Sequence, residues 1–203
     1  MKQLQQHRRI FYETFSTPFG KICLKLGLTP TILTAISLLC ALGAGICFWK
    51  RLPLVGVGMI LANIFVDMLD GATARAGNLS TTFGGILDHV SDRYGEAFIL
   101  VGISLSGMVN PVWGTFALFG MLIASYTREA GEAIGRIENN AVGIVGRLQK
   151  LTIIIIGATL EYFLPGNYLL TYALIIVGLV SYITSIQRLL YAKRVLDSRK
   201  SRR

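Results

Sequence analysis

Five acidic residues lie within thirty residues of otherwise apolar sequence: Asp67, Asp70, Asp88, Asp92 and Glu96. A carboxylate in such a segment is costly unless it is paired, hydrated or bound to a cation. Asp67 and Asp70 are three residues apart and Asp88 and Asp92 are four apart, so each pair lies on one face of a helix. Oxygen ligands suit Mg²⁺, Mn²⁺ or Ca²⁺, whereas Zn²⁺ favours histidine or cysteine. The spacing therefore predicts a site for one or two divalent cations.

The residues beside these aspartates indicate what the site would bind. Gly71 follows Asp70 directly, and Gly84 lies near the start of the next apolar run, which lets a ligand approach the backbone closely. Arg75 carries a planar guanidinium that suits a phosphate group. Carboxylates, divalent cations and an arginine together indicate a phosphorylated substrate, with the cations stabilising the leaving oxygen. The residues alone predict transfer of a phosphoryl-linked group.

Structural ion pairing is the alternative explanation for these acids. Only Arg75 and Arg93 are nearby in the sequence, so the aspartates outnumber their cationic partners. Glu96 differs, because it lies one turn after Asp92 and is expected to pair with Arg93 or with another helix. We expect His89 to be a packing or hydrogen-bonding residue.

The composition places these carboxylates in a membrane. The chain has 203 residues, of which 53% are hydrophobic and 15% charged, and its mean hydropathy is +0.57. Soluble domains carry about 25% charged residues, so an ordinary soluble globule is excluded. A membrane span takes roughly 20 apolar residues, which leaves room for about six spans. The predicted fold is an all-α integral membrane protein with six transmembrane helices, at about residues 30–49, 54–73, 83–105, 113–133, 145–164 and 168–191.

Both ends of the chain differ from this apolar region. Residues 1–28 mix basic and apolar side chains, as expected for an amphipathic helix in the membrane interface. Residues 29–191 form the predicted transmembrane domain, and residues 192–203 a basic cytoplasmic tail. No cleaved signal is expected. The three cysteines show no CxxC spacing and are expected to be packing residues.

The distribution of basic residues predicts the orientation, because loops rich in Lys and Arg stay in the cytoplasm. Basic residues gather in the N-terminal segment, after the fourth run and at the C-terminus, whereas the opposite side holds Lys50 and Arg51. We expect a multi-pass protein of the cell membrane with both termini and the aspartates facing the cytoplasm. The net charge of +9 is expected to favour anionic membrane lipids, and no nucleic-acid partner is expected.

The aspartates belong to a longer pattern of fixed residues over positions 67–92. Asp70 is followed by Gly71 and then by Ala74-Arg75. Eight residues separate Arg75 from Gly84, three separate Gly84 from Asp88, and three separate Asp88 from Asp92. This stretch resembles the signature of the CDP-alcohol phosphotransferases at every fixed position. The resemblance extends along the whole chain and is closest to the phosphatidylinositol phosphate synthase and archaetidylinositol phosphate synthase branch. Shorter matching pieces are Thr17-Pro18, Leu28-Thr29-Pro30 with Thr34, Ser125-Tyr126 followed by Arg128 and Glu132, Arg147 to Leu151, and Gln187-Arg188-Leu189.

The resemblance implies a role for each matched residue. The aspartates of the signature hold two divalent ions, usually Mg²⁺ with Mn²⁺ as an alternative, which assigns Asp67, Asp70, Asp88 and Asp92 as ligands. The last of these, Asp92, is also the base that deprotonates the attacking hydroxyl. The residues implied to hold the CDP-linked lipid are Thr29, Pro30, Thr31, Ile32, Gly71, Ala74, Arg75 and Thr81. Those implied to hold the phosphate of the acceptor are Arg128, Arg147, Lys150 and Arg188.

The implied reaction moves a phosphatidyl or archaetidyl group from a CDP-linked lipid to a soluble phosphorylated polyol, with inositol phosphate as the favoured acceptor. Family resemblance also implies a homodimer. One alternative is an enzyme similar to phosphatidylglycerol phosphate synthase that uses glycerol phosphate. Another is a divalent-cation transporter, which would carry cation flux and would not need Arg75 or Gly71. Two departures concern the acceptor: Thr31 stands where family members often have Asp, and Ala130 where they often have Arg.

Overall fold

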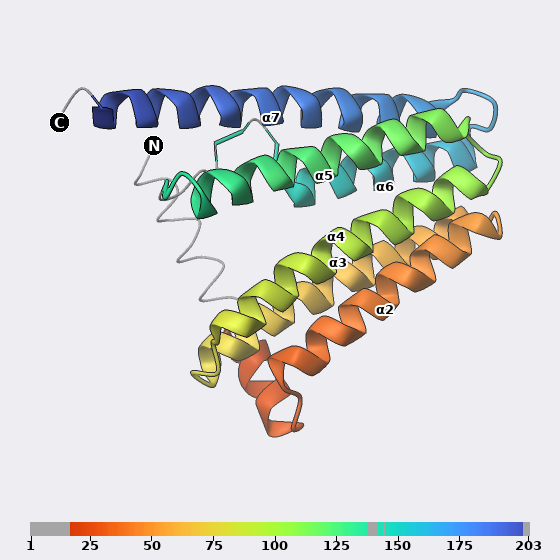
Figure 1. The fold of residues 1–203 in the computed structure, drawn as a ribbon. Coiled ribbons are helices and arrows are strands. Elements are labelled where there is room, and N and C mark those ends of the chain that lie inside the picture. The colour runs from red at the N-terminus through yellow and green to blue at the C-terminus, as the bar shows by residue number, and fades with distance from the viewer. Residues whose placement is uncertain (1–16, 138–141, 144, 201–203) are drawn as a thin grey trace. The chain divides into compact units, whose positions relative to one another are not determined.

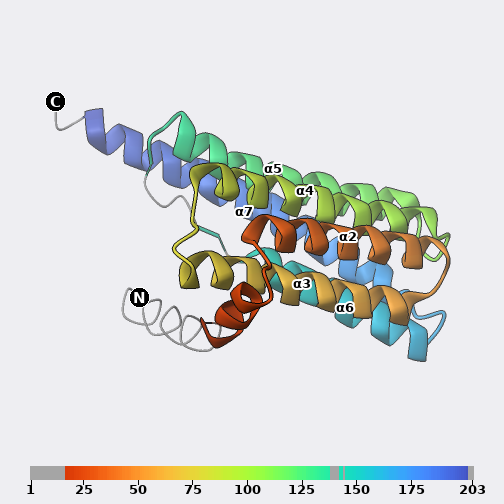
Figure 2. The same cartoon turned by 90° about the horizontal axis from the view of Figure 1, so that it is seen from below.

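The computed structural model describes residues 17–137, 142–143 and 145–200, and all regular secondary structure in these ranges is helical. A short helical segment covers residues 17–25, and six longer helices follow (Figures 1 and 2). They are α2 (Pro30–Trp49), α3 (Pro53–Ala76), α4 (Thr82–Leu105), α5 (Pro111–Ala133), α6 (Arg147–Phe163) and α7 (Leu169–Lys200). The all-α prediction is confirmed for the described residues. The predictions for residues 1–16 and 201–203 lie outside them.

Proline stands at the start of three helices. Pro30, Pro53 and Pro111 begin α2, α3 and α5, where the missing N–H costs no helical hydrogen bond. Ahead of α5, the Asn110 side chain accepts a hydrogen bond from the Val112 N–H at 3.0 Å and caps the helix. Local sequence therefore determines where these helices begin.

Two helices extend beyond the predicted apolar runs. α3 continues to Ala76, so Arg75 lies in its last turn, where a cation interacts favourably with the helix dipole. α7 continues through Lys200 instead of ending near residue 191. Residues 192–200 contain neither glycine nor proline, so no residue there breaks the helix. The predicted tail is therefore helical up to Lys200.

The chain divides into two compact units, which are described separately. The first contains segment 17–25 and most of α2, α3 and α4, which run side by side (Figure 1). Asn63 of α3 donates from Nδ2 to the Ser37 carbonyl of α2 at 2.8 Å. Gly95 of α4 faces Ala41 of α2, and a Cβ at position 95 would lie 3.2 Å from the Ala41 Cβ. A buried hydrogen bond and small side chains thus hold these helices together.

Segment 17–25 packs on α3 in the first unit. A Cβ on Gly20 would lie 2.5 Å from the Ala72 carbonyl oxygen, so the two backbones approach as closely as a glycine allows. The rings of Phe19 and Phe65 meet edge to face with centroids 6.5 Å apart. The described part of the N-terminal segment therefore contacts the end of α3 that carries the aspartates.

The second unit contains α5, α6 and α7 with the remaining ends of α2, α3 and α4. Gly120 of α5 faces the Gly178 carbonyl of α7, and the buried hydroxyls of Thr127 and Ser185 are 2.8 Å apart. Gly157 of α6 likewise faces α7 at a point where a side chain would collide with it. Small residues therefore let α7 pack against both of its neighbours.

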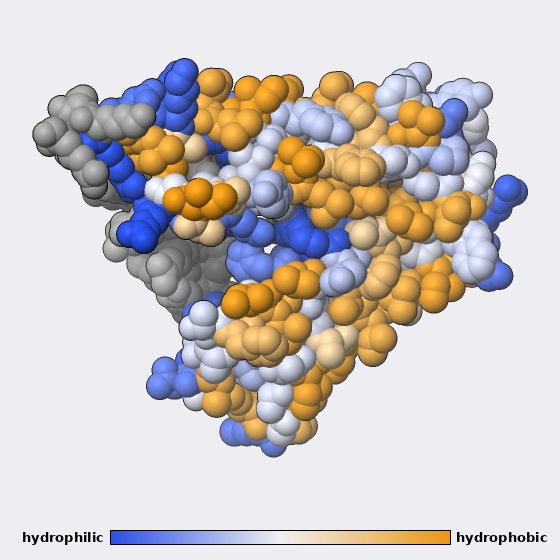
Figure 3. All heavy atoms as spheres, in the orientation of Figure 1, coloured by the Kyte–Doolittle hydropathy of each residue, from blue (hydrophilic) through white to orange (hydrophobic). Residues whose placement is uncertain are grey.

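Three helices, α2, α3 and α7, are long and apolar enough to cross a membrane, counting only the residues that the structure describes. Many of their large apolar side chains point outward; Leu39 of α2 is 65% exposed and Leu179 of α7 is 50% exposed. Figure 3 shows hydrophobic residues along the outer face of α2. Such outward apolar faces are expected of helices that contact lipid tails.

Candidate active site

Three of the aspartates come together near one end of α3 and α4. Asp67 and Asp70 lie one turn apart on α3, and Asp88 faces them from α4. One carboxylate oxygen from each of the three residues lies within 4.8 Å of the other two. Asp70 is buried, and the other two aspartates are partly exposed. Carboxylates this close repel one another unless a cation neutralises their charge.

The chemistry of this cluster fits a divalent cation. Its donors are all carboxylate oxygens, the ligand type that Mg²⁺ and Mn²⁺ prefer in proteins. Only residues 77–81 separate the end of α3 from the start of α4, so two adjacent helix ends hold the donors. The cluster could therefore hold a metal ion.

A hydroxyl of α2 contacts the cluster. The Thr34 Oγ1 lies 2.9 Å from Asp70 Oδ2 and 3.0 Å from the Pro30 carbonyl oxygen, and Thr34 is buried. No role for Thr34 follows from the sequence alone. Thr34 is one of the residues that match in the family resemblance, but the resemblance implies no role for it.

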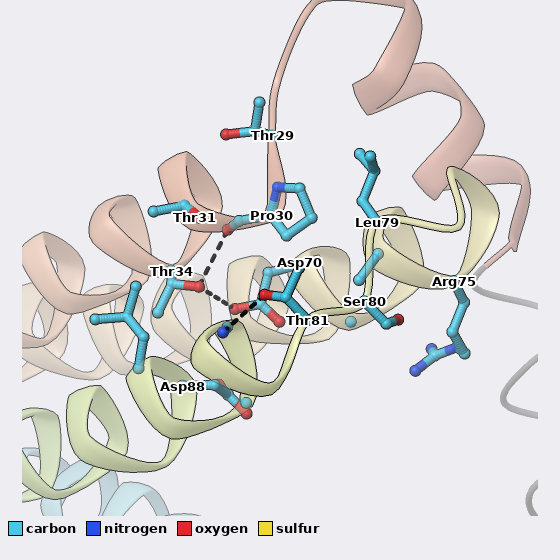
Figure 4. Close-up of a pocket in the computed structure, with 15 residues that line it drawn as sticks. Thr29, Pro30, Thr31, Thr34, Asp70, Arg75, Leu79, Ser80, Thr81 and Asp88 are labelled. Atoms are coloured by element: carbon cyan, nitrogen blue, oxygen red, sulfur yellow. Dashed lines mark hydrogen bonds between the residues drawn. The ribbon is translucent and has the colours of Figure 1, made fainter.

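A cavity of about 400 Å³ adjoins the cluster (Figure 4). Its walls come from the start of α2, the end of α3, the short connection and the first turns of α4. Its lining residues are Thr29, Pro30, Thr31, Thr34, Asp70, Gly71, Ala74, Arg75, Leu79, Ser80, Thr81, Gly84, Gly85, Leu87 and Asp88.

Seven of the eight residues expected to hold the CDP-linked lipid line this cavity. Ile32 does not line it; its side chain is 44% exposed and its N–H donates to Thr29 Oγ1 at 3.3 Å. Thr29 is therefore the N-cap of α2. Thr81 caps α4 in the same way, since its Oγ1 accepts the Gly84 N–H at 2.9 Å. Both hydroxyls fix a helix start in addition to lining the cavity.

Arg75 contributes a cation to the cavity. Its guanidinium lies against Gly71, where an added Cβ would be 3.2 Å from Nη1 of Arg75. Figure 4 shows Arg75 on one side of the cavity, with Asp70 and Asp88 across from it. The cavity thus offers a guanidinium that can donate hydrogen bonds to a phosphate on one side, and carboxylates that can bind a metal ion on the other.

Asp92 lies one turn beyond Asp88 on α4, outside the group of three carboxylates. Its Oδ2 is 3.6 Å from Nη2 of Arg93, whereas Nη1 of Arg93 is 2.9 Å from Oε2 of Glu96. Glu96 is only 1% exposed. The prediction that Glu96 pairs with Arg93 is confirmed.

The four basic residues expected to hold the acceptor phosphate lie on α5, α6 and α7 of the second unit. Arg128 forms an ion pair with Glu132 at 3.0 Å. Arg147 begins α6, and Lys150 follows one turn later with only 5% of its surface exposed. A cation buried this deeply is costly unless an anion or a hydrogen-bond acceptor approaches it.

Arg188 of α7 contacts two backbone carbonyls. Its Nε donates to the Val142 carbonyl at 2.9 Å, and its Nη1 donates to the Ala124 carbonyl of α5. These two bonds set the direction of the guanidinium between α5 and the segment that leads to α6.

The chain is similar to known proteins along most of its length. A family model described as CDP-alcohol phosphatidyltransferase matches residues 27–187. The archaetidylinositol phosphate synthase of Pyrococcus horikoshii is 38% identical over 179 residues, covering 88% of this chain and 90% of that protein. The protein of the same name from Methanothermobacter thermautotrophicus is 35% identical over 159 residues, covering 78% of this chain and 79% of that protein.

The fold is also similar to solved structures of phosphatidylinositol phosphate synthase from Mycobacterium tuberculosis. One of these, with CDP-DAG bound, has a TM-score of 0.78 at 25% identity and covers 87% of this chain and 92% of that chain. Another, in complex with manganese and citrate, has a TM-score of 0.78 at 26% identity and covers 87% of this chain and 88% of that chain. Sequence and fold therefore agree on the same group of relatives.

Proposed function

Because the chain belongs to the CDP-alcohol phosphatidyltransferase family, we propose that it transfers the phosphatidyl or archaetidyl group of a CDP-linked lipid to inositol phosphate and releases CMP. The chain is a multi-pass membrane transferase of lipid biosynthesis. One observation carries the proposal: three clustered carboxylates adjoin a cavity that also contains Arg75. The names of the relatives, which are synthases of archaetidylinositol phosphate and phosphatidylinositol phosphate, support inositol phosphate as the acceptor.

The cavity would hold the CDP-linked headgroup, while the lipid tails extend along outward apolar helix faces. Arg75 would donate to the diphosphate, and Gly71 and Ala74 leave space beside it. Thr81 and the start of α2, from Thr29 to Thr31, would contact the nucleotide. The relative from Mycobacterium tuberculosis with CDP-DAG bound supports this class of substrate.

Asp67, Asp70, Asp88 and Asp92 would hold two divalent ions, Mg²⁺ or Mn²⁺. When bound, these ions would neutralise the diphosphate and stabilise the CMP that leaves. The manganese-containing structure of the relative from Mycobacterium tuberculosis supports the type of ion. Asp92 lies one turn beyond Asp88 on α4 and would complete this set of ligands.

Asp92 would also be the general base. It would take the proton of the acceptor hydroxyl, and the oxygen would then attack the lipid-side phosphorus while the bond from that phosphorus to the CMP oxygen breaks. Arg93 makes its shorter contact with Glu96, at 2.9 Å, and its Nη2 lies 3.6 Å from the Asp92 carboxylate. Arg75 would donate to the leaving phosphate as negative charge develops on it.

Arg128, Arg147, Lys150 and Arg188 would hold the phosphate of the acceptor. The buried Lys150 and the guanidinium of Arg188, which two backbone carbonyls hold in place, support this role. A soluble phosphorylated polyol would reach them from the cytoplasm. Glycerol phosphate carries the same kind of phosphate, so it is the alternative acceptor.

All six helices from α2 to α7 would cross the membrane, with residues 29–191 as one transmembrane domain. α4 has 24 residues, and at 1.5 Å per residue a helix of that length is roughly 36 Å long, longer than the hydrocarbon core of about 30 Å. In the second unit, Arg128, Arg147 and the basic end of α7 lie at the same ends of the helices. This concentration of basic residues supports cytoplasmic termini and a cytoplasmic active site. Segment 17–25, with Lys21 and Lys25 exposed, would lie against anionic lipids.

The decisive experiment measures acceptor choice. Purified protein in lipid nanodiscs would receive CDP-diacylglycerol or CDP-archaeol, Mg²⁺ and either inositol phosphate or glycerol phosphate, with CMP release and product mass as readouts. We expect fast CMP release with inositol phosphate and none after chelation of the metal. Faster CMP release with glycerol phosphate would show that glycerol phosphate is the acceptor. Cation flux in vesicles without CMP release would favour a transporter. Native mass spectrometry of the same sample tests the expected homodimer.

A further inference from the structure

The Thr34 hydroxyl has two acceptors within hydrogen-bond distance. Its Oγ1 lies 2.9 Å from Asp70 Oδ2 and 3.0 Å from the Pro30 carbonyl oxygen (Figure 4). Thr34 is 5% exposed and Asp70 is 7% exposed. Both partners of this contact are therefore nearly shielded from water.

A hydroxyl carries a single hydrogen, so it donates fully to only one of these two oxygens at a time. A hydrogen bond to an ionised carboxylate is shorter and about twice as strong as one to a neutral carbonyl. The bond to Asp70 is therefore favoured over the bond to Pro30, which is a common local contact within a helix. Thr34 then holds one of the two oxygens of Asp70 and determines how the carboxylate is rotated.

The rotation of Asp70 matters because its oxygens must face Asp67 and Asp88. One oxygen from each of these three residues lies within 4.8 Å of the others. The Asp70–Thr34 bond joins two helices, since 36 residues separate these partners in the chain. It also connects the aspartate cluster to α2 at a point where Thr34 lines the cavity together with Thr29 and Pro30.

We infer that Thr34 is a positioning residue that orients the Asp70 carboxylate toward a bound divalent ion. This inference rests on the proposed function, which assigns the aspartates to metal binding. Groups that hydrogen-bond to a metal ligand change metal affinity by roughly 10- to 100-fold when they are removed. Thr34 acts through Asp70 and has no direct contact with the ion in this role.

The test measures Mn²⁺ binding by the purified protein without any lipid substrate, from the electron paramagnetic resonance signal of free Mn²⁺. Thr34→Val keeps the shape of the side chain but removes the hydroxyl, so we expect the dissociation constant to rise by about 10-fold. Thr34→Ser keeps the hydroxyl and should restore binding close to that of the wild type. Ser37→Ala is the matched control, because it removes a buried α2 hydroxyl that donates to the Thr34 carbonyl and not to an aspartate.

A second readout separates positioning from a general loss of structure. In Thr34→Val, the Mg²⁺ concentration for half-maximal CMP release should rise by about 10-fold, while the rate at saturating Mg²⁺ stays within about twofold of the wild type. A purely structural defect would lower the rate at every Mg²⁺ concentration and would leave the midpoint unchanged. That result would overturn the inference.

Equal Mn²⁺ affinity in Thr34→Val and the wild type would also overturn it, as would weak binding in Thr34→Ser. If Thr34→Val does not fold, Thr34→Cys takes its place, because a thiol is a much weaker donor than a hydroxyl; unchanged Mn²⁺ affinity in that variant would be an equally negative result. Failure of the wild type to bind Mn²⁺ would instead contradict the metal assignment in the proposed function.

Discussion

Asp92 has a different environment from the other three aspartates. Asp67, Asp70 and Asp88 form one compact group, whereas Asp92 lies a turn further along α4 beside Arg93. A residue at the edge of the group can contact an incoming acceptor as well as an ion that it shares with its neighbours. This position suits a group that takes up a proton during the reaction.

Asp92→Asn is expected to lower turnover by about 10²- to 10⁴-fold, the usual contribution of a general base. Metal-dependent binding of the CDP-linked lipid should remain largely intact, because three carboxylates and the cavity are unchanged. Rates of CMP release and equilibrium binding of the lipid check the two halves of this prediction. Asp197→Asn makes the same chemical change on an exposed part of α7 and serves as the control. Substantial turnover in Asp92→Asn would rule out Asp92 as the base.

At the residue scale, the spacing of the aspartates along the sequence predicts that they cluster, but it does not predict which other side chains contact them. The three-residue step from Asp67 to Asp70 is enough to place both on one helix face. The sequence also predicts Asp88, which the structure brings to this pair from α4, whereas Asp92 lies outside the group of three. Thr34 could not be predicted in this way. Its contact with Asp70 depends on how α2 packs on α3, which no local pattern determines.

At the element scale, segment 17–25 and α3 approach each other at Gly20. Gly20→Ala would place a Cβ 2.5 Å from the Ala72 carbonyl oxygen, so the segment must move away from α3. We expect a loss of about 1–3 kcal/mol of stability from this overpacking, together with reduced activity, because Ala72 lies between the cavity residues Gly71 and Ala74. Tryptophan fluorescence during thermal unfolding and CMP release are the measurements. Gly58→Ala is the control, since a Cβ there has open space; an equal loss in both variants would contradict the close approach.

The turn between α6 and α7 depends on one carboxylate. Glu161 accepts hydrogen bonds from the backbone N–H groups of Gly166, Leu169 and Leu170, so it caps the start of α7. Glu161→Ala is expected to cost about 0.5–2 kcal/mol, as other lost caps do, and to lower the midpoint of thermal unfolding. Glu161→Gln keeps an acceptor oxygen and should have a smaller effect. Equal midpoints in the Ala variant and the wild type would show that the cap contributes nothing.

The apolar runs and prolines predicted most of the helix positions. Pro30 and Pro111 mark the first residues of α2 and α5, because proline lacks the N–H that a helix interior requires. For α7 the sequence predicts where the apolar run ends, near residue 191, but not where the helix ends. Residues 192–200 are polar and basic but retain good helix formers, so the helix continues after the apolar run has ended.

At the scale of the whole molecule, the distribution of basic residues predicts which helix ends face the cytoplasm. In a variant whose three native cysteines are alanine, Lys50→Cys should react with a membrane-impermeant maleimide added to intact cells. Lys193→Cys should react only after the membrane is permeabilised, because α7 would carry that residue into the cytoplasm. Mass shifts of the labelled protein provide the readout. The opposite labelling pattern would reverse the proposed orientation and place the active site on the outer face.

The polar extension of α7 has a consequence for how the protein would respond to limited proteolysis. Arg199 donates from Nη1 to the Gly135 carbonyl at 2.9 Å and from Nη2 to the Arg136 carbonyl at 2.8 Å, and both carbonyls follow the end of α5. Cleavage after Lys193 would leave every apolar run intact, so the trimmed chain would stay in the membrane. It would nevertheless lose both restraints on the start of the α5–α6 connection, and this connection should then become the next segment to be cut.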